Sequence, residues 1–126
     1  WLTVEEAHAE PAQKESLLAA SSEDTVRSRS WTGKPCRMLK SDWTEAWEKE
    51  GNPKPLGMPL QGLVSSDGMR RTSRYAAVGD CQKVAFNPVG QVVGQIKHVE
   101  SCRDVIFKMV SDYVDGLEHL NSLMPE

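Results

Sequence analysis

Aromatic residues and cysteines are scarce in this chain of 126 residues. Only 6% of the residues are aromatic and 39% are hydrophobic, so any core that the chain builds is modest. Its three cysteines, Cys36, Cys81 and Cys102, match no zinc or redox spacing, and their odd number is typical of reduced thiols in a cytosol. We therefore expect a cytoplasmic location and no metal site, with thiols that are buried or idle.

Long apolar runs and an excess of positive charge are also missing. No apolar run approaches the roughly 20 residues that a helix needs to cross a bilayer, and we expect no secretory leader. The formal net charge is −3, and the small cluster of Arg70, Arg71 and Arg74 does not reverse this balance. Because binding to phosphates requires many Lys and Arg, we expect neither nucleic acid nor a membrane as a partner.

Helical spacing and capping signals predict a mainly helical chain. The expected helices cover residues 11–20, 42–50, 69–78 and 101–123. Asp42 is the predicted N-cap of the second helix, with Glu45 in its first turn. Residues 60–64 could start a further helix, and Asp67-Gly68 is expected either to break it or to cap the next helix. The last segment repeats apolar residues at helical spacing, which predicts a long helix that faces a core.

Two short extended segments are predicted around a turn. Residues 25–32 interleave β-favouring residues with Arg and Ser, which is typical of an exposed strand. Residues 33–35 read Gly-Lys-Pro and turn the chain, and residues 36–39 form a second extended piece. Residues 52–59 carry three prolines, so we expect them to run over the surface as an irregular segment.

Trp43 and Trp47 lie four residues apart and should share one face of the helix predicted over residues 42–50. Buried aromatic side chains usually anchor a helix to the body of a protein, and we expect this of both.

The segment of residues 86–96 places a Gly-Gln pair, Gly90-Gln91, at the mouth of a predicted apolar helix. A glycine permits close approach of its backbone to a ligand, and the following Gln offers both a donor and an acceptor. Gly90 and Gly94 are also spaced as in a close packing contact between helices. The pattern leaves both interpretations open.

Four segments, in this order, resemble one family. They are Leu18-Ala19-Ala20-Ser21 with Asp24-Thr25-Val26, then Thr32-Gly33-Lys34-Pro35-Cys36-Arg37, then Pro55-Leu56-Gly57-Met58-Pro59-Leu60-Gln61, and finally Val89-Gly90-Gln91. Together they resemble the C-terminal third of the nitronate monooxygenase family, formerly called 2-nitropropane dioxygenases. A Gly-Gln pair in a similar position also occurs in the related flavin-dependent enoyl-acyl-carrier-protein reductases.

The resemblance implies an α/β fold, namely the C-terminal part of an FMN-binding (β/α)8 TIM barrel, mainly helical within residues 1–126. A whole barrel needs about 250 residues, so the chain is expected to be one portion of a barrel domain with its flanking helices, and not an independent domain. Its partner would be the N-terminal part of the same barrel. The FMN phosphate site and a catalytic histidine are expected upstream, and His8, His98 and His119 are expected at the surface.

The resemblance assigns cofactor binding to Pro88, Val89, Gly90 and Gln91, and no catalytic residue to this chain. It implies that a small alkyl nitronate is oxidised with dioxygen. Val89 departs from the family pattern, which often has a small residue before Gly-Gln, and Val89 has no hydroxyl group to contact flavin or substrate. Two alternatives remain. One is NAD(P)H-dependent reduction of quinones or enoyl thioesters, and the other is a helical interaction module without a cofactor, binding through its tryptophans and proline-rich segment.

Overall fold

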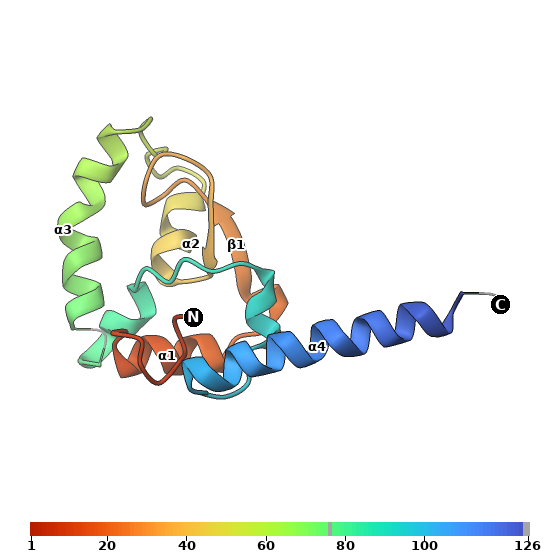
Figure 1. Ribbon diagram of the computed structural model, residues 1–126. Coiled ribbons are helices and arrows are strands. Elements are labelled where there is room, and N and C mark those ends of the chain that lie inside the picture. Colours follow the sequence, from red (N-terminus) through yellow and green to blue (C-terminus); the bar gives the residue numbers. More distant parts are fainter. Residues whose placement is uncertain (76, 125–126) are drawn as a thin grey trace. The chain divides into compact units, whose positions relative to one another are not determined.

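The computed structural model describes residues 1–75 and 77–124 (Figure 1). The chain divides into two compact units, one made of Trp1–His8 with His98–Glu126 and the other of Ala9–Lys97. Helices dominate both units, as predicted. The elements in chain order are α1 (Pro11–Ala19), η1 (Ser22–Asp24), β1 (Thr25–Ser28), β2 (Cys36–Leu39), α2 (Asp42–Glu48), α3 (Leu60–Arg74), η2 (Gly79–Val84), η3 (Gln91–Gln95) and α4 (Cys102–Ser122), where η denotes a 3-10 helix.

The two strands form an antiparallel hairpin in which Thr25 pairs with Leu39 and Ser28 pairs with Cys36. The predicted strand over residues 25–32 is wrong beyond Ser28, because Trp31 turns inward and is completely buried. It is also not an exposed strand, since Thr25 and Ser28 are both buried. The predicted turn is confirmed at Gly33, whose positive φ of 81° is a conformation that favours glycine.

Gly33 lies directly against the proline-rich segment. A Cβ atom at this position would be 2.7 Å from both the carbonyl oxygen of Leu56 and the nitrogen of Met58. The fully buried Gln61 joins the same two loops, because its Nε2 donates to the carbonyl of Ser30 and its Oε1 accepts the N–H of Leu56. Two of the segments that carry the family resemblance therefore meet in space.

The N-cap of helix α2 lies one residue earlier than predicted. Its N-cap is Ser41, whose hydroxyl accepts the N–H of Thr44, while the Thr44 hydroxyl accepts the N–H of Ser41. Asp42 is the first helical residue, so its carboxylate does not cap the helix. Serine and aspartate are both good caps, and the reciprocal Ser41–Thr44 pair decides between them.

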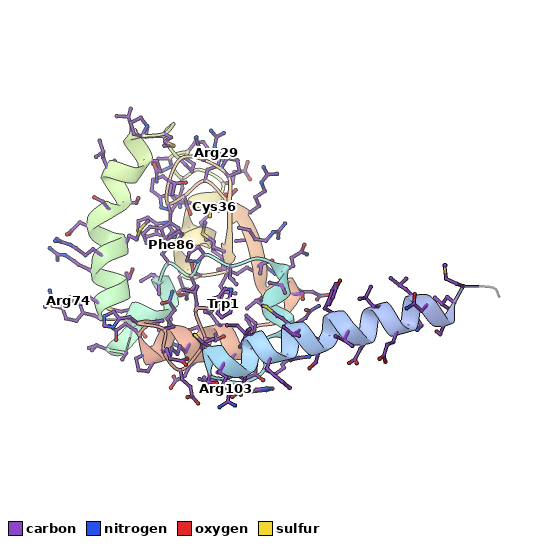
Figure 2. All side chains as sticks on the ribbon, viewed as in Figure 1. Trp1, Arg29, Cys36, Arg74, Phe86 and Arg103 are labelled. Atoms are coloured by element: carbon purple, nitrogen blue, oxygen red, sulfur yellow. The ribbon has the colours of Figure 1, made fainter. Side chains whose placement is uncertain are left out.

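Helix α3 runs without interruption through Asp67 and Gly68, so the predicted break or new cap is wrong, and it ends at Arg74 instead of Val78. Asp67 pairs with Arg70 and Arg71 along the helix at 2.8 Å each, which supports the turn that follows it. A Cβ atom at Gly68 would lie 3.7 Å from the ring of Trp43, so the glycine sits where α2 packs on α3. The exposed Arg74 extends away from α3 (Figure 2).

An aromatic cluster forms one centre of the larger unit. Trp31 stacks on Trp43 with ring centroids 4.2 Å apart, and it also meets Phe86 at 5.3 Å (Phe86 is labelled in Figure 2). Trp47 meets Trp43 at 6.0 Å but is only half-buried. The prediction that the two tryptophans of α2 anchor it to the body is thus confirmed most fully for Trp43. A second apolar cluster consists of Leu17, Ala20, Leu39 and Val93, with Val89 packed against it.

Helix α4 is the longest helix and begins at the predicted signal. Ser101 is its N-cap, with the Asp104 N–H donating to the Ser101 hydroxyl and that hydroxyl donating to the Asp104 carboxylate. The prediction that α4 faces a core is not met within the described chain, because none of its residues is buried. Within its own compact unit, most of its apolar side chains are exposed. No helix in the described part of the chain is long and apolar enough to cross a membrane.

Candidate functional site

The segment before Gly90 is fixed along strand β2. The Leu39 N–H donates to the carbonyl of Asn87 at 3.0 Å, and the Val89 N–H donates to the carbonyl of Arg37 at 3.2 Å. Pro88 faces Met38 in an isolated antiparallel bridge. Because proline has no N–H to donate, it is tolerated at such an edge position. Residues 87–89 therefore continue the hairpin as a third, very short extended piece.

The segment after Gly90 is fixed from the other side by the turn at Ser22. The Ser22 hydroxyl donates to the carbonyl of Gln91 at 2.7 Å. Gly94 lies against the same residue, since a Cβ atom at position 94 would be 2.8 Å from the Ser22 backbone nitrogen. Val93, between them, is completely buried in the Leu17 cluster. The predicted packing contact at Gly94 is thus confirmed, although its partner is a turn and not a second helix.

Gly90 differs from Gly94 in what surrounds it. Its φ of −84° and ψ of 176° are extended values that any residue adopts, and a Cβ atom at this position would meet nothing within 4 Å. Neither the backbone conformation nor packing within the described chain requires glycine here. Gly90 and Gln91 are exposed, and the Gln91 side chain makes no hydrogen bond within the part of the chain that the structure describes. The loop is rigidly held yet presents an open backbone face.

The prediction that the Gly-Gln pair opens an apolar α-helix is wrong. The pair opens η3, a 3-10 helix of five residues in which the Val93 N–H donates to the carbonyl of Gly90 at 3.1 Å. The segment cannot extend into an α-helix, because Val89 is hydrogen-bonded to β2 and both Gln91 and Gly94 contact Ser22. A helix of this length contributes little macrodipole, so the backbone of Gly90 and the amide of Gln91 are the polar groups that matter.

The lining of a groove of about 270 Å³ includes Asn87, which precedes this loop in the sequence. Asn87 is 6% exposed and lines the groove together with Ser16, Lys40 and Gln82. The Gln82 amide is already engaged, donating to the Ser16 hydroxyl at 3.0 Å. The lining of the groove also includes the charged residues Asp42, Glu45 and Lys83.

The other residues considered for chemistry lie where the sequence predicted. His8, His98 and His119 are all exposed, and the Nε2 atom of His98 is 2.7 Å from a carboxylate oxygen of Glu100. The Cys102 thiol has a pKa above its ordinary value, chiefly because it is desolvated and also because the Glu6 carboxylate is close. A raised pKa favours the protonated thiol, and all three cysteines are half-buried.

Sequence reasoning missed Ser22 and the turn that carries it. Ser21 and Asp24 form a capping box around η1, in which the Ser21 N–H and hydroxyl each donate to the Asp24 carboxylate at 2.7 Å. These hydrogen bonds hold the pKa of Asp24 below its ordinary value. The spacing of serine and an acidic residue three positions later is a known signal for such a turn, so the sequence contained the information.

Comparison with known proteins places the chain within longer ones. The Mycobacterium tuberculosis protein "Putative monooxygenase Rv1533" is 45% identical to it over 126 residues, which cover 98% of this chain and 34% of that protein. FabK from Thermotoga maritima matches 98% of this chain with a TM-score of 0.71 and 21% identity, over 37% of its own length. A mutant of the same FabK gives a TM-score of 0.62 at 22% identity, over 34% of its length. No protein-family model matches the chain.

The chain thus has the fold of about a third of FabK and spans about a third of the length of the curated relative it matches. Its own mainly helical character agrees with a part of a larger fold.

Proposed function

We propose that this chain is the C-terminal third of an FMN-dependent oxidoreductase of the nitronate monooxygenase type, with the chain forming part of a TIM barrel. The longer polypeptide that would contain it is called the parent protein below. The ordered motifs, the 45% identity to a protein named a monooxygenase and the fold shared with part of FabK all support this proposal. The observation that carries it is Gly90, a glycine that the described chain does not itself require, held on a fixed loop.

The residues at the loop fit a flavin. A planar ring can approach the backbone of Gly90 closely because no side chain stands in the way. Pro88 and the half-buried Val89 would form an apolar wall that excludes water, and the exposed Gln91 amide can donate to or accept from a polar ring edge. FMN would supply the two-electron redox chemistry, which no amino-acid side chain in this segment can provide.

The same residues limit what this chain contributes to the reaction. None of Pro88, Val89, Gly90 and Gln91 carries a titratable side chain, so these residues bind and orient but do not move a proton. We therefore assign the catalytic base to the histidine expected upstream. The substrate that we assign is a small alkyl nitronate, oxidised with dioxygen, in a cytoplasmic enzyme.

Anaerobic mixing of the purified parent protein with candidate substrates tests the proposal. We expect a yellow protein whose extracted cofactor is FMN and whose visible absorption bleaches on addition of an alkyl nitronate. Bleaching by NADPH and not by a nitronate would replace the proposed reaction with reduction of quinones or enoyl thioesters. A colourless protein that retains no flavin would instead favour an interaction module without a cofactor.

A further inference from the structure

A chain of hydrogen bonds links the two sides of Gly90 through the hairpin. On one side, the Val89 N–H donates to the carbonyl of Arg37 at 3.2 Å. The guanidinium of Arg37, through Nη1, donates to the hydroxyl of Thr25 at 3.0 Å. That hydroxyl in turn donates to the carbonyl of Ser22 at 3.1 Å.

The series of hydrogen bonds ends on the other side of Gly90, where the Ser22 hydroxyl donates to the carbonyl of Gln91 at 2.7 Å. Residues 89 and 91 are thus joined by hydrogen bonds that run through one residue each of η1, β1 and β2. We call Ser22, Thr25 and Arg37 the Gly90 bracket. All of them lie in the unit Ala9–Lys97, so the bracket belongs to one compact part of the molecule.

The position of Ser22 in the bracket is itself determined by two independent contacts. The Ser21–Asp24 capping box fixes the turn that carries it. Gly94 packs so closely on it that a Cβ atom there would be 2.8 Å from its backbone nitrogen. Ser22 therefore touches the Gly-Gln loop twice, once through its hydroxyl and once through its backbone.

A glycine has the least restricted backbone of all residues, so its position depends on what holds its neighbours. A binding group is effective only when it is held within about 0.5 Å of the productive geometry by supporting contacts. The bracket provides this support to Gly90, whose own atoms make no side-chain contacts. The Gln91 carbonyl, next in the chain, is its attachment point.

We propose that Ser22 is a positioning residue of the flavin site, holding the Gln91 carbonyl so that the backbone of Gly90 keeps a fixed place against the flavin ring. This inference rests on the proposed function for its flavin, but the bracket itself does not. Arg37 acts in the same way on the other side of Gly90, through the N–H of Val89, and Thr25 joins Arg37 to Ser22. Their role would account for why these two residues lie within the segments that resemble the family.

The test uses the parent protein with Ser22→Ala and, as a second variant, Thr25→Val, which preserves side-chain shape and removes only the hydroxyl. Ser66→Ala is the matched control, because the Ser66 hydroxyl is also exposed and also donates to a backbone carbonyl, that of Leu63 at 3.0 Å. The readouts are the dissociation constant for FMN, the visible circular dichroism of bound flavin, and amide hydrogen exchange at Gly90–Val92 in the apoprotein.

We expect Ser22→Ala and Thr25→Val to weaken FMN binding by about two- to tenfold, the range expected when one hydrogen bond is lost. Both should alter the flavin circular dichroism and speed exchange at residues 90–92, while Ser66→Ala should change none of these. An unchanged flavin spectrum and dissociation constant in both variants, with only the melting temperature lowered, would overturn the proposal.

Failure of the proposed function gives a different result. If the parent protein binds no flavin, the spectral readouts vanish, and hydrogen exchange still reports on the bracket. Faster exchange at residues 90–92 in Ser22→Ala and not in Ser66→Ala would then show that the bracket holds the loop, although the flavin part of the proposal is wrong. Unchanged exchange in Ser22→Ala would show that Ser22 does not hold the loop at all.

Discussion

Two glycines four residues apart have opposite surroundings, and a single added carbon atom should distinguish them. Position 94 has no room for a side chain, since a Cβ atom would be 2.8 Å from the Ser22 nitrogen, whereas position 90 is open. We expect Gly94→Ala in the parent protein to lower the free energy of unfolding by about 1–3 kcal/mol, the usual cost of overpacking. Urea denaturation measures this change.

Gly90→Val should act in the opposite way. The extended backbone of Gly90 accommodates valine, so the urea midpoint should be almost unchanged, while the branched side chain should weaken FMN retention by blocking approach of the ring. Gel filtration followed by flavin absorbance measures retention. If both glycine variants affect only stability, the segment is a packing motif and our site assignment is wrong.

The tryptophans of α2 should contribute unequally to stability. Both rings are half-buried, but Trp43 stacks on the fully buried Trp31 at 4.2 Å, whereas Trp47 meets Trp43 at the longer distance of 6.0 Å. We expect Trp43→Ala to lower the free energy of unfolding by about 3 kcal/mol and Trp47→Ala by about 1–2 kcal/mol, because Trp47 makes the weaker ring contact. Flavin affinity should stay nearly constant among folded molecules. A selective loss of flavin in either variant would place α2 in the cofactor site.

At the scale of a whole element, Gly68 offers a stabilising substitution in α3. It lies inside a helix of 15 residues, and an added Cβ would reach the Trp43 ring at 3.7 Å, an ordinary contact distance. Gly68→Ala should therefore raise the unfolding free energy by up to about 1 kcal/mol, the helix-propensity difference between the two residues. Thermal unfolding of the parent protein checks this, and a lower melting temperature would show that α3 needs flexibility there.

The turn η1 should depend on pH in a defined direction. The pKa of Asp24 is lowered because the Ser21 hydroxyl and N–H donate to its carboxylate. A carboxyl group with a lowered pKa stabilises the folded state above its unfolded pKa of about 3.9, and that contribution is lost as the pH falls further. We expect the Ser21 amide to lose its protection from hydrogen exchange below about pH 4, and NMR measures this exchange. In Asp24→Asn this pH dependence should disappear.

At the scale of the whole molecule, we predict that residues 1–126 do not fold on their own. Apolar side chains along α4, among them Val110, Tyr113, Leu117 and Leu120, are exposed by 57%, 66%, 43% and 61%. The apolar face spans more than the narrow seam of a two-stranded coiled coil, so it is suited to a broad layer. We predict that it packs on the preceding part of the parent protein.

Two measurements test this prediction. The isolated chain should aggregate or melt broadly without cooperativity, because an unburied helix face is poorly stable. In the parent protein, the amides of α4 should exchange slowly. A sharp two-state melt of the isolated chain, or fast exchange of α4 in the parent protein, would contradict the prediction.

Much of the secondary structure followed from local chemistry alone. Pro11 at the first position of α1, the turn at Gly33 and the cap at Ser101 depend on a few neighbouring atoms, so sequence patterns predicted them. The exposure of the three histidines was also predicted from the sequence, whereas the Gly90–Gly94 spacing left a packing contact and a ligand contact both open. The resemblance to a family depends on the order of motifs and needs no coordinates.

Long-range contacts decided the rest. Gly68 stays in a helix because Trp43 packs beside it, and Trp31 ends a strand because its ring is buried on Trp43. The Gly-Gln loop is a 3-10 turn because β2 and Ser22 hold its two ends, and such contacts join residues up to 69 positions apart in the sequence. Local propensities differ by about 1 kcal/mol or less per residue, so burial and hydrogen bonds between distant segments overrule them.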